Sequence, residues 1–316
     1  MNVRTAEFVS PKHPDKICDQ IADSILDAYL KKDEYSRTAI EVMGGHNLIV
    51  ILGEVKSTKD VKEIPIRKII ESIVGNNFNI NIHLEEQSPE ISRGVDIGGA
   101  GDQGIMVGYA CNETKNHMPL EYELARDLCR RIYEKYPYDG KTQVTLEGNR
   151  VLKVVASFQN VKTAELKDLV KSIIKSEEYI INPGGDWKIG GFEADSGLTG
   201  RKLVVDSYGP GVLVGGGSFS GKDATKVDRS GAYMARKIAV DYLKKYKAQE
   251  VLVKLAYAIG QEEPLMKSVI IDGQEEEIKG YDLRPNGIIK LLDLRKPIYA
   301  QTSQWGHFGN GFKWDC

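Results

Sequence analysis

The stretch NLIVILGEVKSTKDVKEIPIRKIIES (residues 47–72) decides the fold, because it joins a strand pattern to a helix pattern. Its first half is an apolar run, and its second half spaces isoleucines three and four residues apart. The stretch VLKVVASFQNVKTAELKDLVKSIIKS (residues 151–176) repeats this order, and Val251–Ile259 followed by Leu283–Leu292 is a third, looser copy. Copies about a hundred residues apart predict three similar α+β units, each a sheet with helices on one face. Because strand followed by helix is a common order, coincidence remains the alternative.

The residues before the first copy add a helix and a hairpin. Apolar residues spaced for one helical face predict a helix from Pro14 to about Lys31, with Pro14 in its first turn. Two strand-like runs, Arg37–Met43 and Asn47–Val55, are joined by Gly44-Gly45, which indicates a β-hairpin. Glycine-rich joints separate the copies at 94–108, 183–191 and 208–221. Such long loops in a compact domain are usually functional.

Composition bounds the class of protein. The 316 residues are 41% hydrophobic and 28% charged with a net charge of -2, as in an ordinary globular protein of about two or three domains. This balance argues against a nucleic-acid-binding or membrane protein, so local groups of Lys and Arg must hold any anionic ligand. The cysteines, Cys18, Cys111, Cys129 and Cys316, form no C-x-x-C pair, which favours a reducing cytosol and a cytoplasmic location.

The stretch GGGSFSGKDATKVDR (residues 215–229) nearly matches a nucleotide-binding P-loop. From Gly216 to Lys222 it has the spacing G-x-x-x-x-G-K, but Asp223 stands where a P-loop has the Ser or Thr that ligates Mg²⁺. A carboxylate at that position would face phosphate oxygens without an intervening cation. The segment therefore indicates polyphosphate chemistry and argues against the usual P-loop scaffold.

Charged residues crowd the end of the same stretch. Lys222 and Lys226 could neutralise a triphosphate, while Asp223 and Asp228 could hold Mg²⁺. The alternative is a solvated turn before a helix, because Thr225-x-x-Asp228 is itself a capping pattern. The neighbouring glycines favour the binding site, since they allow a ligand to approach the backbone closely.

A second candidate anion site lies at the start of the first predicted helix, where Ser10–Lys16 includes His13 and Asp15. Free backbone N–H groups and the helix dipole favour a phosphate there. His13 could donate a hydrogen bond to a leaving oxygen, and Asp15 could ligate Mg²⁺. The alternative is an ordinary capped helix with solvated charges.

Weaker candidates lie elsewhere along the chain. Arg201 and Lys202 follow a glycine turn and could bind an anion, and Asp102 lies in a glycine-rich loop, although a plain turn explains either segment. Glu41 and Glu54 interrupt apolar strand runs, where a carboxylate needs a cationic partner unless it faces outward. His307 is more typical of a packed histidine than of a ligand.

Taken together, the motifs resemble those of the S-adenosylmethionine synthetase (methionine adenosyltransferase) family. The matching segments are His13–Lys16, Gly99–Gly104, Gly197–Lys202, Gly215–Arg229, Tyr257–Gly260, Asp282–Pro285 and Gly306–Gly309. They occur in order along nearly the full chain. The resemblance implies an enzyme that joins ATP to L-methionine, in which the methionine sulfur attacks ribose C5′, displaces triphosphate, and the triphosphate is then cleaved to phosphate and diphosphate. A thioether carries no proton, so the reaction needs preorganised cations more than a general base.

The resemblance also implies roles for individual residues. The implied catalytic residues are His13, Lys141, Arg201, Lys202, Lys222 and Lys226. The implied ATP contacts are His13, Asp139, Lys141, Asp186, Trp187, Asp195, Arg201, Lys202, Ser218 and Lys222. The implied methionine contacts are Glu54, Gln87, Asp195 and Lys226. Asp15 and Asp228 would ligate Mg²⁺ (two ions per site), Glu41 would ligate K⁺, and Asp102 would reach a partner subunit.

The family fold implies three α+β domains around a pseudo-threefold axis, each discontinuous in sequence. The expected N-terminal domain is 1–11 with 113–190, the central domain is 12–90 with 191–229, and the C-terminal domain is 91–112 with 230–316. The last includes a gate loop at 91–101 that is shorter than the family's usual loop. A homodimer with active sites at the subunit interface, or a dimer of such dimers, is expected.

The sequence departs from the family pattern in two features, and two alternative functions stay open. Trp187 replaces the usual phenylalanine of the family, and the short gate loop could change water exclusion or product release. The main alternative is an ATP-dependent kinase or NTPase that uses the Gly216–Lys222 loop, which the missing Ser or Thr at Asp223 disfavours. The other is a non-catalytic subunit that binds nucleotide.

Overall fold

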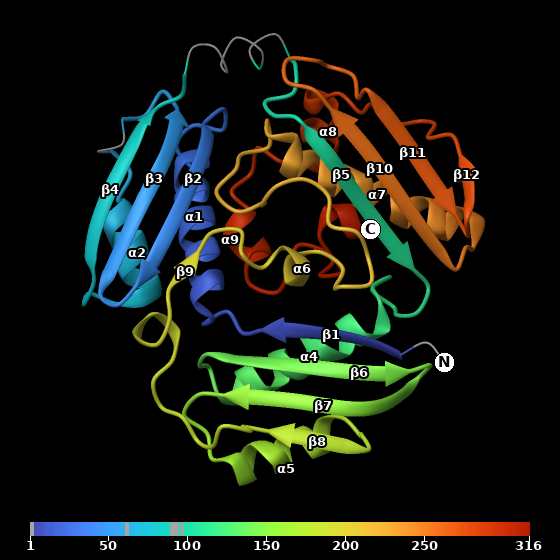
Figure 1. The fold of residues 1–316 in the computed structure, drawn as a ribbon. Helices are drawn as coiled ribbons and strands as arrows, with labels where there is room; N and C mark the ends of the chain where they lie inside the picture. Colours follow the sequence, from blue (N-terminus) through green and yellow to red (C-terminus); the bar gives the residue numbers. More distant parts are fainter. Residues whose placement is uncertain (1–2, 61–62, 89–94, 96–97) are drawn as a thin grey trace.

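The computed structural model describes residues 3–60, 63–88, 95 and 98–316, and it contains three four-stranded sheets arranged around a common centre (Figure 1). Sheet I has the order β1 (Val3–Val9), β6 (Gly140–Glu147), β7 (Arg150–Phe158), β8 (Glu178–Ile181). Sheet II has the order β4 (Asn79–Glu86), β3 (Leu48–Lys56), β2 (Arg37–Gly45), β9 (Gly197–Leu198). Sheet III has the order β12 (Gln274–Glu276), β11 (Met266–Ile271), β10 (Glu250–Tyr257), β5 (Gly104–Cys111).

Helices pack behind the sheets. The helices are α1 (Pro14–Leu30), α2 (Ile66–Val74), α4 (Leu120–Lys135), α5 (Thr163–Ile173), α6 (Leu203–Asp206), α7 (Val227–Tyr246), α8 (Pro285–Leu292) and α9 (Tyr299–Thr302). One long helix covers each sheet: α4 packs on β1 and β6, α1 on β2, and α7 on β5 and β10. Each sheet also joins strands from distant parts of the chain. The predicted fold class, three sheet-plus-helix domains that are discontinuous in sequence, is confirmed.

The local sequence patterns explain the elements that lead to the centre of the molecule. Helix α1 begins at Pro14, and His13 caps it because His13 Nδ1 accepts the backbone N–H of Asp15 at 3.2 Å. In β2 the alternating residues Thr38, Ile40 and Val42 are buried, as expected for a strand with one face on a helix layer. The predicted helix and hairpin are therefore confirmed.

The repeat is real in two of the three units and different in the third. In sheets I and II a hairpin is followed by a helix and then a parallel strand, through β7–α5–β8 and β3–α2–β4. Sheet III is antiparallel throughout: a loop of eight residues joins β10 to β11, a two-residue turn joins β11 to β12, and β5 also pairs antiparallel with β10. Helix α8 comes only after them and packs on α7. The predicted strand and helix of the third copy are therefore both present, as β10 and α8, but β11 and β12 lie between them and the sheet has antiparallel pairs where the other two have a parallel one.

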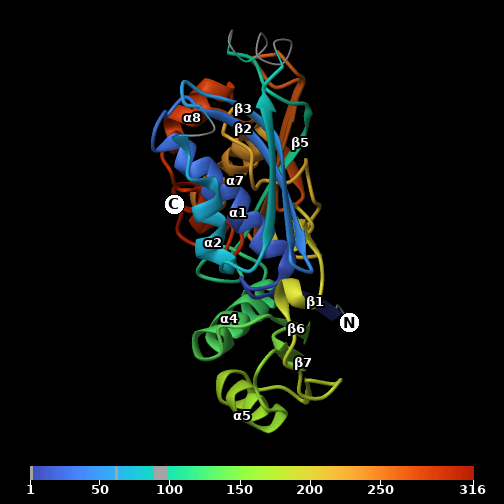
Figure 2. The ribbon, with the colours of Figure 1, turned by 90° about the vertical axis from the view of Figure 1, so that its left-hand side faces the viewer.

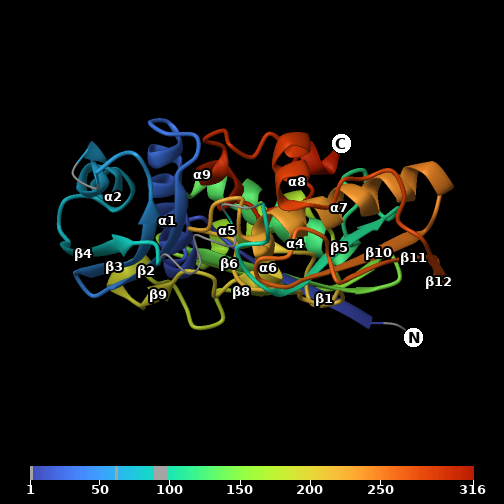
Figure 3. The same ribbon diagram turned by 90° about the horizontal axis from the view of Figure 1, so that it is seen from above.

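The molecule has a sheet face and a helix face (Figures 2 and 3). Strand residues that point away from the helices include several exposed apolar side chains: Met43, Leu48, Leu52, Ile105, Leu198 and Met266. The helix-facing residues form two cores, one within sheet II with α1 and α2, and one that sheets I and III share. In the part of the chain that the structure describes, no helix is long and apolar enough to cross a membrane.

The expected gate loop and one expected domain boundary can be compared with the structure. Much of the expected gate loop at 91–101 falls on residues 91–94 and 96–97, which lie outside the described residues. The expected boundary between residues 229 and 230 falls inside α7, which packs as one helix on sheet III. The other expected boundaries stay a prediction.

Candidate active site

The segment from β9 to the start of α7 runs through the middle of the molecule, between the three sheets (Figure 1). It carries Arg201, Lys202 and Lys222, which we call the clamp cations. The first turn of α1 meets this segment, because Asp15 Oδ1 accepts the backbone N–H of Leu198 at 3.0 Å. Residues nearly two hundred positions apart in sequence therefore share one site.

Asp15 forms one centre of charge in this site. Its carboxylate makes an ion pair with Lys202, and its Oδ1 lies 3.6 Å from Arg201 Nε. Burial alone would raise the pKa of Asp15, but Lys202 and the Leu198 N–H hold that pKa below its ordinary value. The predicted metal ligand and two predicted phosphate ligands thus lie together, with Asp15 ionised.

His13 is the neutral member of the site. Burial, together with the nearby Lys202 and Lys141, lowers the pKa of His13 to about 3. Because Nδ1 accepts the N–H of Asp15, the proton of the neutral ring is placed on Nε2. His13 can therefore donate one hydrogen bond from Nε2 at neutral pH, without carrying a charge.

Lys222 occupies a second centre of charge. It makes an ion pair with Asp228, and its Nζ lies 4.0 Å from Asp102 Oδ2. Asp228 also accepts the backbone N–H of Gly217 at 3.1 Å. Burial and the neighbouring Asp228 raise the pKa of Asp102. Asp102, expected to contact a partner subunit, therefore also faces Lys222 of its own chain.

Asp223 explains why this stretch differs from a P-loop. It is buried and accepts the backbone N–H groups of Thr38 at 2.9 Å and Thr225 at 2.8 Å, and it makes an ion pair with Lys226. Although burial alone would raise the pKa of Asp223, Lys226 and these donors hold it below its ordinary value. The residue ties the loop to β2 and does not face an open phosphate site.

Two further observations test the two interpretations of this loop, a phosphate-binding loop and a turn capped by Thr225. The backbone N–H groups of Gly217 and Gly221 donate to carboxylates, Asp228 and Asp23, where a P-loop would offer such groups to phosphate. The alternative cap at Thr225 is also wrong: α7 begins at Val227, and Thr225 Oγ1 has no hydrogen-bond partner among the described residues. The kinase or NTPase alternative thus loses its main support.

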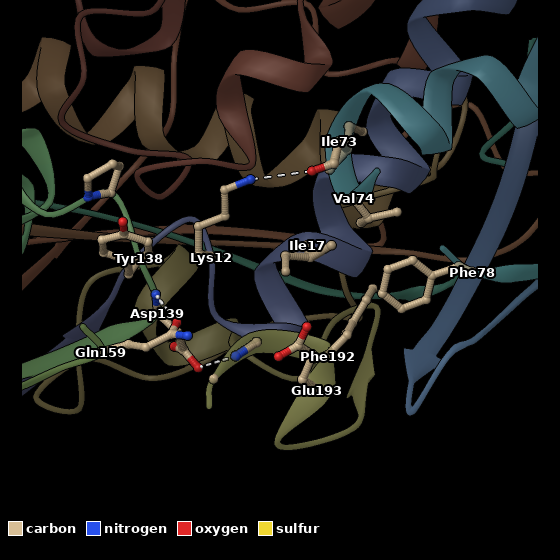
Figure 4. Close-up of a pocket in the computed structure, with 13 residues that line it drawn as sticks. Lys12, Ile17, Ile73, Val74, Phe78, Tyr138, Asp139, Gln159, Phe192 and Glu193 are labelled. Carbon is tan, nitrogen blue, oxygen red and sulfur yellow. Dashed lines mark hydrogen bonds between the residues drawn. The ribbon is translucent and has the colours of Figure 1, made fainter. Parts of the chain in front are cut away.

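The predicted nucleotide contacts come from sheet I and the segment after it. Asp139, just before β6, accepts the backbone N–H of Gly191 at 3.0 Å, and burial raises its pKa. Asp139 lines a cavity of about 420 Å³ beside Lys12, Gln159 and Phe192 (Figure 4). Of the predicted ATP contacts, the lining of this cavity includes Asp139 and none of the clamp cations.

The remaining predicted nucleotide residues make contacts of different kinds. The Asp186 side chain accepts the backbone N–H and the hydroxyl of Thr163, at 2.8 and 2.6 Å, and so caps the first turn of α5. Trp187 is half-buried beside Gly190. Ser218 packs against Gly200, so the two cation-bearing loops touch. Lys141 and Asp195 are exposed and lie close enough to influence the pKa of His13.

The predicted potassium ligand Glu41 and two of the predicted methionine contacts, Glu54 and Gln87, lie on or just after strands of sheet II. In the strand register Ala39 of β2 pairs with Glu54 of β3, and on its other side it bridges to Lys222. Glu41 follows on the same strand, where burial raises its pKa and Lys222 opposes that rise. Gln87 is buried after β4, with its N–H bonded to Val55 O at 3.2 Å. Glu54 therefore lies one strand away from Lys222.

The acidic residues fit a metal that arrives with a phosphate ligand. Among the residues that the structure describes, no three His, Cys, Asp or Glu side chains cluster closely enough to hold an ion by themselves. Mg²⁺ commonly binds through one or two carboxylates with substrate phosphates and water completing its shell. Asp15 and Asp228 meet that requirement, each beside a cation that it could release to a phosphate.

The sequence analysis missed a buried network behind the site. Lys16 lies between Asp19, at 3.0 Å, and Asp206, with which it makes a close ion pair. Asp23 binds Arg229 through two hydrogen bonds of 2.7 and 2.8 Å. The signal was present: Asp15, Asp19, Asp23 and Asp27 recur every four residues in a helix whose other residues are mainly apolar. All four are buried on α1.

This network predicts a pH dependence of stability. Burial raises the pKa of Asp206 from 3.8 to about 7, so the folded protein holds a proton that the unfolded chain releases. The contribution to the free energy of unfolding is full below about pH 4 and is lost as pH rises through about 7. Asp206→Asn fixes the neutral form and leaves Lys16 paired with Asp19. We expect the variant to exceed wild type by on the order of 1 kcal/mol at pH 8, and by less at pH 5.

Urea denaturation at several pH values between 5 and 8 measures this difference. Asp127→Asn serves as the control, because Asp127 makes a solvent-exposed pair with Arg131. A difference between Asp206→Asn and wild type that stays constant with pH would show that Asp206 does not titrate in this range.

Comparisons with known proteins identify the family of the chain. Family models of S-adenosylmethionine synthetase match nearly the whole length: the N-terminal domain at residues 1–93, the central domain at 97–187 and the C-terminal domain at 189–316. A solved structure described as an unusual S-adenosylmethionine synthetase from Campylobacter jejuni is 32% identical, with a TM-score of 0.90. That match covers 100% of this chain and 97% of the other. The chain therefore belongs to the S-adenosylmethionine synthetase family, a family of transferases whose substrates are ATP and methionine.

Proposed function

We propose that this protein forms S-adenosylmethionine by attack of the methionine sulfur on ribose C5′ of ATP, with triphosphate as the leaving group. The observation that carries the proposal is that Arg201 and Lys202 pair with Asp15 beside a neutral His13, while Lys222 pairs with Asp228 in a loop that touches theirs. A departing triphosphate gains negative charge, and fixed cations stabilise that charge most when they are already in place.

The residues of the site have distinct tasks in this reaction. The clamp cations and Lys141 bind the triphosphate oxygens. His13 donates from Nε2 toward the oxygen that leaves C5′, and its low pKa keeps the ring neutral until charge develops there. Asp15 and Asp228 hold Mg²⁺, which neutralises phosphate charge, and Glu41 holds K⁺ beside Lys222. The same cations retain the triphosphate for its cleavage to phosphate and diphosphate.

We assign the methionine to the edge of the site formed by sheet II. Glu54 and Asp195 offer carboxylates for its ammonium group, and Gln87 offers an amide. Lys226 is buried and paired with Asp223, so it reaches the shared ATP–methionine region only if that pair opens. Trp187 offers a broad ring for the adenine base, with Asp139, Asp186 and Ser218 around the nucleotide.

We infer a homodimer that closes the site. The sheet face exposes several large apolar side chains, among them Met43, Leu52 and Ile105. A second copy laid on this face could cover the clamp cations and exclude water from both sites. Asp102 Oδ2, 4.0 Å from Lys222 Nζ, could then also reach the partner. Two such dimers could in turn pair into a dimer of dimers.

The proposed reaction is tested by its products. Purified protein with ATP, methionine, Mg²⁺ and K⁺ should release S-adenosylmethionine, phosphate and diphosphate in equal amounts, as followed by chromatography and phosphate assays. Leaving out methionine should abolish nucleoside transfer, chelating Mg²⁺ should stop turnover, and replacing K⁺ by Na⁺ should slow it. ADP as the main product, or turnover that does not depend on methionine, would overturn the proposal.

A further inference from the structure

Two buried carboxylates on α1 hold the loops that carry the clamp cations. Asp19 Oδ1 accepts the backbone N–H of Gly200 at 2.9 Å, and Asp23 Oδ1 accepts the backbone N–H of Gly221 at 2.8 Å. In each loop the residue that follows the glycine is a clamp cation. The same arrangement therefore occurs twice, at positions four residues apart on one helix face.

The two glycines leave these loops little freedom to move. Gly200 has a φ of +77° and Gly221 a φ of +82°, a conformation that other residues adopt only with strain. A Cβ added to Gly200 would lie 2.4 Å from Ser218 Cβ, and one added to Gly221 would lie 2.0 Å from Ile40 O. Each peptide is thus packed on one side and bonded to a carboxylate on the other, which sets the direction of the next side chain.

The carboxylates are themselves held in place. Asp19 lies 3.0 Å from the buried ammonium of Lys16. Asp23 binds both terminal nitrogens of Arg229, and Arg229 also donates to the carbonyl of Lys222 at 3.1 Å. Both anchors belong to a long helix whose opposite side packs in the core of sheet II. A rigid helix therefore fixes the position of the two loops.

We propose that Asp19 and Asp23 are positioning residues for catalysis: by binding the Gly200 and Gly221 amides they fix the clamp cations without contacting substrate. The inference rests on the proposed function, since it requires the clamp cations to bind triphosphate. A carboxylate is a stronger acceptor for an N–H than a neutral oxygen, which explains why acidic residues occupy these buried positions. A displacement of a catalytic group by about 1 Å can lower a rate about 100-fold.

Asp19 allows a matched test. The Lys16 cluster has one cation and two carboxylates, so either carboxylate can be neutralised while Lys16 keeps a partner. Asp19→Ala removes the bond to Gly200, and Asp19→Asn keeps a weaker, neutral acceptor. Asp206→Asn, compared at pH 8 where wild-type Asp206 is ionised, removes the same charge from the same cluster and leaves the Gly200 bond intact. For each variant we would measure the Kd for inorganic triphosphate by calorimetry, kcat and KM, and the thermal midpoint.

We expect Asp19→Ala to weaken triphosphate binding about tenfold and to lower kcat about 10- to 100-fold, with KM for methionine unchanged. Asp19→Asn should recover to within about fivefold of wild type, and Asp206→Asn should stay within about twofold. If Asp19 had only a structural role, kcat would fall in proportion to the thermal midpoint across the variants. Asp206→Asn is expected not to lower that midpoint.

Specific results would overturn the inference. These are a folded Asp19→Ala variant with wild-type kcat, or an Asp206→Asn variant that loses as much as Asp19→Ala. If Asp19→Ala does not fold, Asp19→Asn is compared with Asp206→Asn, because both lose one charge and only the former weakens the Gly200 bond; equal kcat values would contradict us. Wild-type protein that binds no triphosphate and makes no S-adenosylmethionine is a different result, and it refutes the proposed function.

Discussion

Lys222→Ala is expected to lower kcat for S-adenosylmethionine formation about 100- to 1,000-fold, the cost of removing one preorganised charge from a developing anion. Lys222 lies between Asp228 and Asp102, in a loop that two carboxylates hold in place. Its removal leaves Asp228 with the N–H of Gly217, so the free energy of unfolding should fall by only about 1 kcal/mol. Steady-state kinetics and urea denaturation measure the two effects separately.

Lys237→Ala is the matched control for this variant. Lys237 also makes a partly buried ion pair, with Asp241, further along α7. We expect wild-type kinetics and a change in stability of about 1 kcal/mol or less. If Lys222→Ala lowered stability as strongly as activity, or left kcat unchanged, the loop would be structural and the assignment of Lys222 to the clamp would be wrong.

Asp23→Ala is expected to destabilise the protein by about 3 to 5 kcal/mol, because it leaves the charge of Arg229 buried and unpaired. Arg229 is fully buried, and it is held by Asp23, the Tyr233 hydroxyl and Thr302 Oγ1. The substitution also leaves the Gly221 N–H without its acceptor. Equilibrium denaturation in urea gives the change in the free energy of unfolding.

Two companion variants show whether the unpaired charge is the cause. Asp23→Ala combined with Arg229→Met removes both charges and should be less destabilised than Asp23→Ala alone. Asp127→Ala removes an exposed partner of Arg131 and should change stability by less than about 0.5 kcal/mol. If the double variant loses as much stability as the single variants Asp23→Ala and Arg229→Met lose in sum, the cost comes from lost packing and not from the unpaired charge.

Local patterns predicted the local parts of the fold. The helix at α1 and the β2–β3 hairpin follow from spacings within about fifteen residues, and the structure confirms them. The third copy has its predicted strand and helix but a different sheet, because strand and helix patterns do not reveal whether neighbouring strands pair in parallel or antiparallel. That choice depends on the connection: β10, β11 and β12 are joined without a helix between them, whereas β3 and β4 are joined through α2.

The site shows the same division between local and distant information. Sequence analysis found the charged motifs, but it could not show that Asp15 meets Lys202, since 187 positions separate them. It also could not distinguish a ligand residue from a scaffold residue of the same type. Asp223, a candidate Mg²⁺ ligand in the sequence, uses its carboxylate to hold β2 and Lys226. Burial and hydrogen-bond partners make that distinction, and both require the tertiary structure.

The most direct test of the central claim is to follow the oxygen that joins ribose C5′ to the α-phosphorus of ATP. ATP labelled with ¹⁸O at that bridging position is incubated with methionine and the protein, and mass spectrometry locates the label. Attack of sulfur at C5′ breaks the bond between carbon and this oxygen, so all the label should leave with phosphate and diphosphate. Label that stays on the nucleoside, in ADP or AMP, would mean that phosphorus is the atom attacked and would contradict the account.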